Sequence, residues 1–475
     1  MILLPMVLVP IAAAAVAYLA RPLSLRLGLL VGTSILHLYA VGRLWNGTVA
    51  PEVGGWLAID ALGLLVVSLV SVLFLVIAVY AAGFLQTEPP RGGRVFVSGL
   101  LAFLSAATLV AVSHHMALLW VGMETTTLAL APLVYHRHDR RSLEAVWKYL
   151  LLSSVGIALA LLGTFFLAAA QTSGRPLLLE DMIAGSGSLQ PALLQTAFIF
   201  LLVGYGTKMG LAPLHAWKPD TYGEAPSLVA GLMAGALTSC AFLGLARITE
   251  ITMAAGQGEF VQPLLVAFGV MSLVVAAAFM IGQSDLKRML AYSSVEHMGL
   301  LVLGLGLGGV GRYGTVLHLV NNALIKGLMF LAVGNVVLVT GSSHAGAARG
   351  ILRRAPITGI LLLLGLFAVT GSPPFGLFLS EFTILNAAIG QGHPWVAAAM
   401  LALLALIFVG MAAVVLEMIY DPPLTEAPPV RESVLLVAGP IVLLALVLLL
   451  GVYIPPALQR VLTEAAWGLG GGGAR

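Results

Sequence analysis

Fourteen apolar segments of membrane length run through this chain, mostly with short polar connections between them. A helix needs about 20 mainly apolar residues to cross the hydrocarbon core of a bilayer. With 60% hydrophobic and 9% charged residues, the chain is also far from the roughly one-quarter charged composition of a soluble domain. The sequence therefore predicts an all-α polytopic membrane protein. Its spans are expected near residues 2–20, 27–44, 60–85, 95–112, 116–135, 143–170, 192–212, 226–247, 262–282, 290–309, 313–340, 357–387, 395–419 and 433–454.

Lysine and arginine residues are unequally divided between the two faces of this predicted bundle. The loops after odd-numbered segments hold fourteen of them, with Lys218 and Lys287 included. The other face holds six, with Arg247 included. Because cytoplasmic loops carry the excess of positive charge, the distribution predicts a multi-pass protein of a cytoplasmic membrane with both termini outside.

Two of the apolar segments are interrupted. Residues 203–226 place Lys208 shortly before Pro213, and proline both removes a backbone donor and clashes with the preceding turn. Within a bilayer, such a break is tolerated where protein or a wet cavity satisfies the backbone. A second break, at Pro373 and Pro374, comes about 160 residues later. Paired interrupted segments point to a transport site, although a lysine at this depth could also reach the membrane surface.

Several ionisable side chains fall inside the apolar segments. They are Glu124, Lys148, Lys208, Glu296, His297, His318, Lys326 and Glu381. His318, Asn322 and Lys326 are spaced i, i+4, i+8 and share one helix face. Since lipid cannot solvate such a face, it points into the bundle and indicates an ion or proton path. Any one of these residues alone could instead form a hydrogen bond that joins two helices.

The motifs of redox and ATP-driven chemistry are missing from the sequence. The single cysteine, Cys240, rules out a disulfide framework and a cysteine metal site, and there is no P-loop, haem or iron–sulfur motif. Residues 136–139 could be imagined as a metal site, but a solvated basic loop explains them better. The net charge of +3 indicates no nucleic-acid partner. We therefore expect no cofactor or metal in this chain, and energy from an ion gradient or a partner protein.

Four motifs carry a resemblance to a known family. They are KMGLAPLHAWKPD at 208–220, QSDLKRMLAYSSVEHMG at 283–299, HLVNNALIK at 318–326 and PPFGLFLSE at 373–381. In order, spacing and host spans they resemble the antiporter-like membrane subunits of respiratory complex I and the group 4 hydrogenases. The hydrogenase-4 component F type is the most similar. The match covers roughly residues 95–420.

This resemblance implies fourteen spans with two inverted five-helix repeats, each containing a discontinuous helix. It implies N-terminal helices 1–3 in residues 1–94, a first repeat in 95–247, a second repeat in 248–420, and helix 14 with a tail in 421–475. It also implies a bacterial or archaeal membrane, and proton or sodium translocation driven by a redox module such as a hydrogenase or a quinone reductase. The partners would be other membrane subunits and a peripheral arm that carries iron–sulfur clusters with nickel–iron or quinone.

The resemblance also implies roles for single residues. Glu124 would be the glutamate of the fifth span and the partner of Lys208 in the seventh, and Lys148 would be the lysine at the start of the sixth. His318 and Lys326 match the eleventh span, Glu381 matches the terminal ionisable residue of the twelfth, and His297 joins the expected proton path. The helix breaks would be Pro213, Pro373 and Pro374.

This sequence departs from the family pattern in two spans. The eighth span usually carries a lysine or histidine that links the repeats, but here it offers only Thr238, Ser239 and Cys240. Asn322 replaces a second histidine of the eleventh span. We therefore expect ordered water to bridge more of the route. The sequence ends at Arg475 without a long amphipathic helix, which is typical of the intermediate subunit type.

Three functional hypotheses follow. In the first, the chain is the ion-pumping subunit of a redox-driven complex, and Lys208 holds or releases a proton as Glu124 moves. Lys326 and His318 would relay the proton, and Glu381 would deliver it outside. In the second, the chain belongs to a redox-independent cation/proton antiporter. In the third, it is a membrane scaffold for a carbon-uptake complex or another enzyme, without conduction of its own.

Overall fold

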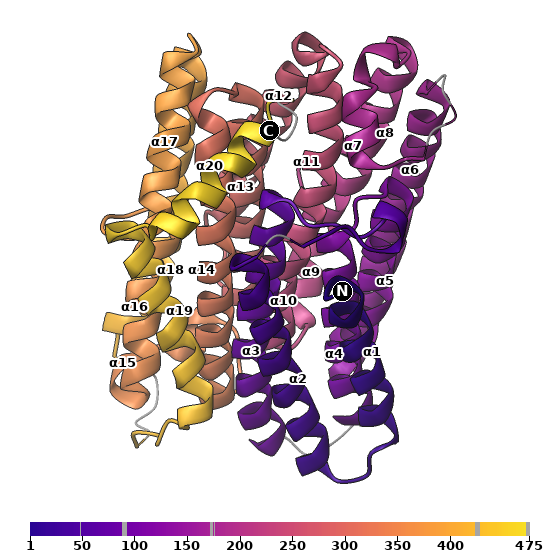
Figure 1. Cartoon of the computed structure of the whole chain (residues 1–475). Helices are drawn as coiled ribbons and strands as arrows, with labels where there is room; N and C mark the ends of the chain where they lie inside the picture. The colour runs from indigo at the N-terminus through magenta and orange to yellow at the C-terminus, as the bar shows by residue number, and fades with distance from the viewer. Residues whose placement is uncertain (48, 88–92, 172–173, 175, 423–427, 472–475) are drawn as a thin grey trace.

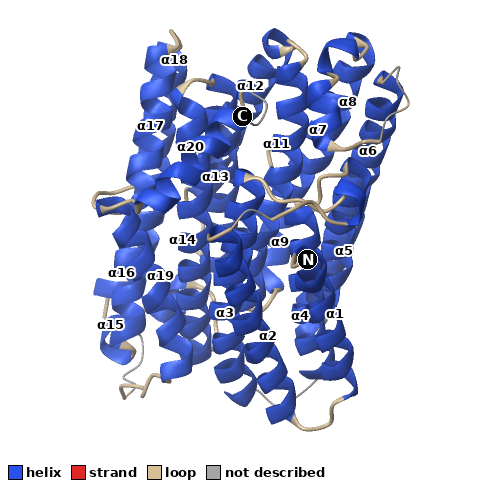
Figure 2. Ribbon diagram, viewed as in Figure 1, coloured by secondary structure: helices blue, strands red, loops and turns tan. Residues whose placement is uncertain are grey.

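A computed structural model describes the chain except for residues 48, 88–92, 172–173, 175, 423–427 and 472–475. The described residues are helical, with only isolated β-bridges between loops (Figure 2). Twelve of the described helices are long and apolar enough to cross a membrane. The shorter helix α1 (Leu3–Leu19) and the pair α16 (Pro356–Val369) and α17 (Gly376–Gly390) complete fourteen spans, which confirms the predicted fold class. Arg91, Arg175 and Arg475, which were counted as loop charges, lie outside the described residues.

The N-terminal part consists of α1, α2 (Leu23–Trp45) and α3 (Ala61–Thr87). The backbone N–H groups of Ile2, Leu3 and Leu4 donate to the carboxylate of Glu52 at 2.5, 3.2 and 3.0 Å. A carboxylate is favourable at the positive end of a helix, so Glu52 anchors the start of α1. Helix α3 packs against helices from both halves of the chain, including α4 and α14.

The first group of helices begins with α4 (Gly93–Val112), α5 (Met116–Val134) and α6 (Arg140–Ala170). A short helix, α7 (Leu179–Ala184), lies in the connection that follows. The seventh span is broken into α8 (Pro191–Met209) and α9 (Trp217–Glu224). The eighth span consists of α10 (Ser227–Leu232), a π-helical turn at Met233–Leu237 and α11 (Thr238–Ala254).

The second group repeats this order with α12 (Gly258–Met280), α13 (Leu286–Leu307) and α14 (Val310–Thr340). A four-residue helix, α15 (Ile351–Arg354), precedes the broken pair α16 and α17, and α18 (Pro394–Tyr420) follows it. In both groups the third helix has 31 residues and the fourth span is broken. Five spans separate the starts of the two groups, so the groups begin on opposite faces. In Figure 1 the orange and yellow helices of the C-terminal part lie on the left and the magenta helices of the first group on the right, and α19 packs against the indigo helix α3.

The C-terminal part contains α19 (Val434–Val452) and α20 (Pro456–Gly468). Helix α20 runs obliquely across the bundle in Figure 1 and packs on α3 and α14. The sequence predicted only a tail here. Helix α20 has 13 residues, which is too short for a span, and it buries only Leu462 and Ala465. For this reason it does not stand out in the sequence as an apolar segment of membrane length.

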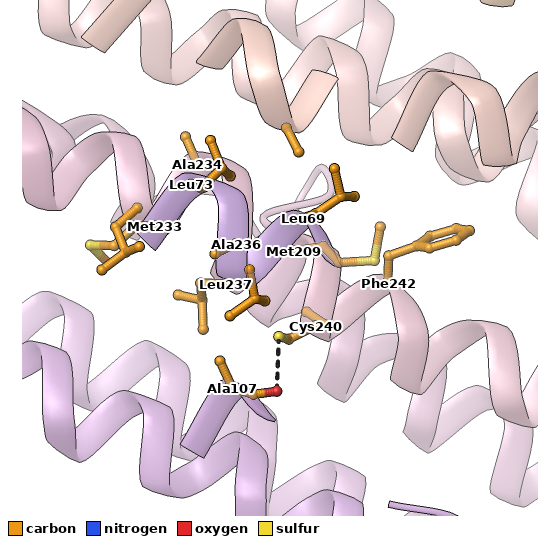
Figure 3. Close-up of a cluster of buried hydrophobic side chains, with 14 of the residues drawn as sticks. Leu69, Leu73, Ala107, Met209, Met233, Ala234, Ala236, Leu237, Cys240 and Phe242 are labelled. Carbon is orange, nitrogen blue, oxygen red and sulfur yellow. Dashed lines mark hydrogen bonds between the residues drawn. The ribbon is translucent and has the colours of Figure 1, made fainter. Parts of the chain in front are cut away.

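The middle of the eighth span is enclosed by apolar side chains. Figure 3 shows Leu69 and Leu73 of α3 and Met209 of α8 around the π-helical turn and α11. Cys240 is buried here and its thiol donates to the carbonyl oxygen of Ala107 at 3.8 Å. The middle of the eighth span is therefore packed with sulfur and hydrocarbon groups.

Candidate functional site

The break in the seventh span is stabilised by hydrogen bonds from neighbouring helices. Helix α8 ends at Met209, and Gly210 takes a left-handed conformation with φ 74°. The indole N–H of Trp217 donates to the Thr207 carbonyl at 2.8 Å, and the Ala212 N–H donates to the Ser272 hydroxyl at 3.0 Å. Backbone groups freed by a membrane helix break need such partners. The peptide bonds preceding Pro213 and Pro374 are both cis.

Lys208 is fully buried at the end of α8, as predicted for the seventh span. Its Nζ donates to Thr127 Oγ1 at 2.5 Å and to the Tyr149 hydroxyl at 3.2 Å. Thr127 in turn donates to Glu124 Oε2 at 3.3 Å, and Ser154 donates to the other carboxylate oxygen at 3.4 Å. A hydroxyl group can accept and donate at once, so Thr127 joins the lysine and the glutamate.

A second fully buried lysine, Lys218, lies on α9 beyond the same break. Its Nζ donates to Ser294 Oγ of α13 at 2.9 Å. A Cβ at Gly210 would lie only 2.4 Å from Cδ of Lys218, so the lysine side chain crosses the end of α8. Lys218 therefore touches helices of both groups.

Lys326 of α14 is the buried lysine of the second group. Its Nζ donates to Ser293 Oγ at 2.7 Å, and Ser293 donates to Glu296 Oε2 at 3.3 Å. This is the same order of lysine, hydroxyl and carboxylate as in Lys208, Thr127 and Glu124. In both places a hydroxyl group provides the contact between a buried base and a buried or half-buried acid.

Two histidines continue the row. His297 Nδ1 lies 3.1 Å from His318 Nε2, and His318 Nδ1 lies 2.9 Å from Ser380 Oγ. Ser380 donates to the Leu377 carbonyl at 2.8 Å, so it accepts from His318. His318 then accepts from His297 through its other ring nitrogen. This assignment leaves His297 Nε2 as a buried acceptor, which has no hydrogen-bond partner among the described residues.

Glu381 lies on α17 just beyond the second break. A Cβ at Gly371 would lie 1.9 Å from Glu381 Oε2, so the carboxylate fills the space beside this glycine, whose φ is 64°. Glu381 Oε1 is buried without a hydrogen-bond partner among the described residues. The side chain of Asn322, on the predicted polar face of α14, is likewise buried and without a described partner.

His297, His318 and Glu381 form the one group of three candidate metal ligands among the described residues. One ligand atom from each lies within 4.8 Å of the others. The group can share a proton through its nitrogen and oxygen atoms. The charge of Lys326 interacts with that of Glu381, and a positive charge nearby opposes the binding of a cation.

Lys148 lies away from the buried row. Its ammonium group donates to Asp220 Oδ2 at 2.7 Å and pairs with Glu144 at 2.8 Å, and its side chain is 42% exposed. Asp220 also accepts from Arg288 at 3.0 Å. These residues line a cavity of about 620 Å³ on the side of the basic loops. Lys148 lies on α6 near the start of the sixth span, at the mouth of the bundle.

Three basic residues that were sorted into loops are buried. Lys218 and Lys287 lie in the interior, where the Lys287 ammonium donates to the Ala225 carbonyl at 2.7 Å. Arg247 donates two hydrogen bonds to Asp60, at 2.5 and 2.7 Å. Segment-end charges look like loop charges because hydropathy locates a span only to within several residues. Lys218 and Lys287 no longer count among the loops of the basic face, and Arg247 no longer counts on the opposite face. The loops of the basic face therefore still hold the larger number of lysines and arginines.

The residues that sequence reasoning missed are the hydroxyl bridges and Lys218. Thr127, Ser293 and Ser294 are common residues in membrane helices and carry no distinctive signal. Lys218 has one available signal, because it follows His215 and Trp217 in the stretch that re-enters the bundle after Pro213. Of the predicted residues, the structure brings together Glu124 with Lys208, and His297 with His318, Lys326 and Glu381.

Over most of its length the chain is similar to known proteins of one family. The family described as "NADH:quinone oxidoreductase/Mrp antiporter, TM" matches residues 113–408. The chain is 31% identical over 448 residues to the "Hydrogenase-4 component F homolog" of Methylacidiphilum infernorum (isolate V4), covering 91% of this chain and 93% of that protein. It is 32% identical over 373 residues to "NADH-quinone oxidoreductase subunit N" of Desulforudis audaxviator (strain MP104C), covering 76% and 72%.

A solved structure has the same fold. A chain of the membrane-bound sulfane sulfur reductase, an archaeal respiratory membrane complex, superposes with a TM-score of 0.90 at 23% identity. The superposition covers 98% of this chain and 97% of that chain. At this level of identity the likeness concerns the fold alone.

Proposed function

The chain belongs to the family of NADH:quinone oxidoreductase and Mrp antiporter membrane subunits, and we propose that it is the proton-translocating subunit of a redox-driven complex. The observation that carries this proposal is the buried row of ionisable and hydroxyl groups. It includes hydrogen-bonded groups of both helix groups, with Glu124 in the first and Glu381, close to His297 and His318, in the second. The relatives named as a hydrogenase component and a quinone oxidoreductase subunit support the redox-driven part.

The chemistry of the row favours protons over sodium ions. Lysine ammonium groups are donors only and offer no lone pair to a metal ion. Lys208, Lys218 and Lys326 each donate to a hydroxyl group of the row. A hard cation needs several oxygen ligands at one place, whereas a proton needs only alternating donors and acceptors. Histidines and hydroxyl groups both donate and accept, and a lysine becomes an acceptor once it has released its proton.

The proposed switch is the pair Glu124 and Lys208. Burial disfavours a charged ammonium group and a nearby carboxylate favours it, so a change in their separation changes whether the lysine holds a proton. One charge that crosses 100 mV requires about 2.3 kcal/mol. Since one pKa unit corresponds to about 1.4 kcal/mol, a change of a few units in proton affinity is enough to work against a membrane potential.

The remaining predicted residues extend the route in both directions. We assign Lys148 to the mouth on the side of the basic loops, where its cavity is open to solvent. Lys326, His297 and His318 would relay the proton in the second group, and Glu381 would deliver it outward. Ordered water would join the steps at which no side-chain hydrogen bond is formed.

We further propose the division into helices 1–3 (residues 1–94), two antiporter-like units (95–247 and 248–420) and a C-terminal part (421–475). The excess of basic loop residues on one face supports an orientation with both termini outside. The partners would be other membrane subunits and a peripheral arm with iron–sulfur clusters and nickel–iron or quinone. The names of the relatives support this assembly.

Inside-out membrane vesicles that contain the native complex test the proposal. An electron donor for the peripheral arm should acidify the vesicle lumen, as read by a pH-sensitive dye, equally well in sodium-free and sodium-containing buffer. Acidification that requires sodium would contradict the choice of proton.

A redox-independent cation/proton antiporter remains the second candidate, because the family description includes the Mrp antiporter. The same vesicles separate the two functions. A sodium pulse without any electron donor should leave the lumen pH unchanged if the complex is redox-driven. A rapid pH change after the pulse would favour the antiporter instead.

A further inference from the structure

We infer that Lys218 carries protons between the two helix groups, in place of an ionisable residue in the middle of the eighth span. This inference rests on the proposed proton translocation. Among the described residues, Lys218 is the lysine whose ammonium group reaches from the broken seventh span to α13 of the second group. The proton-transfer role of Lys218 follows from its juxtaposition with Ser294, Ser293 and Lys326.

The first step is the position of Lys218 at the end of α8, the helix that carries Lys208. The side chain of Lys218 passes over Gly210, the residue that ends α8. Helix C-termini favour positive charge, so the end of the helix that carries Lys208 is a suitable place for a protonated Lys218. The Tyr222 ring lies 5.9 Å from its ammonium group and adds a weak attraction for the charged form.

The second step is the contact with the other group. Lys218 donates to Ser294 at 2.9 Å, and Lys326 donates to the adjacent Ser293 at 2.7 Å. Two lysines from different groups thus meet at consecutive serines of one helix. Their charges repel each other, so protonation of one favours release from the other. That coupling is what a transfer step between the two groups requires.

The third step is that the middle of the eighth span offers no alternative. Its charged residues Arg247 and Glu250 lie further along α11, where Arg247 is held by Asp60. Thr238 donates to the Ala234 carbonyl and Ser239 to the Gly235 carbonyl, both at 2.6 Å within their own helix. Cys240 donates to a backbone carbonyl of α4. Their protons are therefore engaged with the backbone. The apolar side chains shown in Figure 3 surround this part of the span and leave Lys218 as the connection.

Other charged groups near Lys218 are consistent with a transfer role. Lys218 interacts electrostatically with His297 of α13 and with His215 in the break. Asp220, two residues along α9, lines the cavity that opens towards the basic loops. Helix α9 thus connects that cavity with the buried row, and Lys218 stands at the inner end of this connection.

The test compares variants of the intact complex in the vesicle assay. Lys218→Met keeps the length of the side chain, and it should slow proton translocation by about a hundredfold, the contribution of a positioned proton-transfer group. Lys218→Arg keeps the charge but cannot release a proton at neutral pH, so it should be equally slow. Lys287→Met is the matched control, since Lys287 is also a buried lysine but bonds only a backbone carbonyl.

A milder pair keeps the test decisive if the lysine variants do not assemble. Ser294→Ala should slow translocation by about tenfold, because it removes the partner of a charged group. Ser239→Ala, a buried serine of the eighth span, should leave the rate unchanged. Wild-type rates in Ser294→Ala, or in either assembled Lys218 variant, would overturn the inference.

Lys208→Ala in the same vesicles distinguishes a failure of the inference about Lys218 from a failure of the proposed function. If Lys208→Ala is slow while Lys218→Met is as fast as wild type, proton translocation stands and the role of Lys218 falls. If both variants translocate protons like wild type, the proposed function falls as well.

Discussion

Lys208 reaches Glu124 through the hydroxyl group of Thr127, which accepts a hydrogen bond from the lysine and lies 3.3 Å from the carboxylate. The Lys208 ammonium group and the Glu124 carboxylate are thereby linked through Thr127 and do not form a direct ion pair. Since a hydroxyl group can reverse its donor direction by rotation, this bridge can pass a proton or break the contact when either helix moves. The switch then depends on an uncharged residue.

Thr127→Val removes this bridge and keeps the shape of the side chain. We expect proton translocation per complex to fall by about tenfold, the factor that corresponds to one hydrogen bond to a charged group. Thr126→Val is the control, because Thr126 is also buried on α5 but donates only to the Met123 carbonyl. Equal rates in the two variants would show that the bridge has no role.

Gly371→Ala displaces the carboxylate of Glu381, since the new Cβ would lie 1.9 Å from Oε2. A left-handed alanine costs about 1–2 kcal/mol by itself, so a control with the same backbone strain is needed. Gly282→Ala supplies it, with a φ of +77° and open space around the glycine. Thermal unfolding should show a similar loss of stability for both variants, while the vesicle assay should show slow translocation only for Gly371→Ala.

The pair Asp60 and Arg247 is predicted to stabilise the fold without conducting protons. Asp60→Asn leaves the buried guanidinium uncompensated and should cost about 3–5 kcal/mol of unfolding free energy. Arg247→Met combined with Asp60→Asn should recover a large part of that loss. A double variant no more stable than Asp60→Asn would contradict this account.

The same pair predicts a pH dependence. Burial raises the pKa of Asp60, but the charges of Arg247 and His114 outweigh it and hold the pKa below the usual range. A carboxylate with a lowered pKa stabilises the fold above its unfolded value and loses that effect only as the pH falls through the folded value. The stability difference between wild type and Asp60→Asn should thus stay constant from neutral pH to about pH 5 and shrink only in stronger acid.

Glu52→Gln should loosen the start of α1, because the charged acceptor of three backbone N–H groups becomes neutral. Burial raises the pKa of Glu52, and the N–H groups of Leu4, Ile2 and Leu3 lower it further than burial raises it. Hydrogen exchange over residues 2–10 should therefore quicken in the variant at neutral pH. Exchange at α20, which packs on α3 and α14, serves as the internal control and should not change.

The spans could be predicted from their apolar composition. Most charged members of the row could be predicted because a charged residue stands out within an apolar segment. Lys208, Lys326 and Glu381 stand out in this way. The connections between them could not be predicted, since Thr127 or Ser293 becomes a bridge only through the packing of two helices. Hydropathy also placed Lys218 in a loop, because the polar residues around it resemble a connection rather than the re-entrant half of a broken helix.

Hydropathy fails for a second reason at segment ends. Lys148 and Arg247 both stand near the ends of their spans, yet one is half-exposed in an ion-pair cluster and the other is fully buried. The difference lies in the partners, since Arg247 meets Asp60, which is far away in sequence, while Lys148 meets Asp220 at an open cavity. Only the packing of distant segments decides between these outcomes.

The most direct test of the central claim is the rate of proton translocation per assembled complex in Lys208→Ala, measured in inside-out vesicles with a pH-sensitive dye. The amount of complex is fixed by quantifying a partner subunit, and Lys287→Met is run in parallel. The account predicts a rate reduced by about a hundredfold in Lys208→Ala and a wild-type rate in Lys287→Met. A wild-type rate in assembled Lys208→Ala would show that protons do not pass through the buried row.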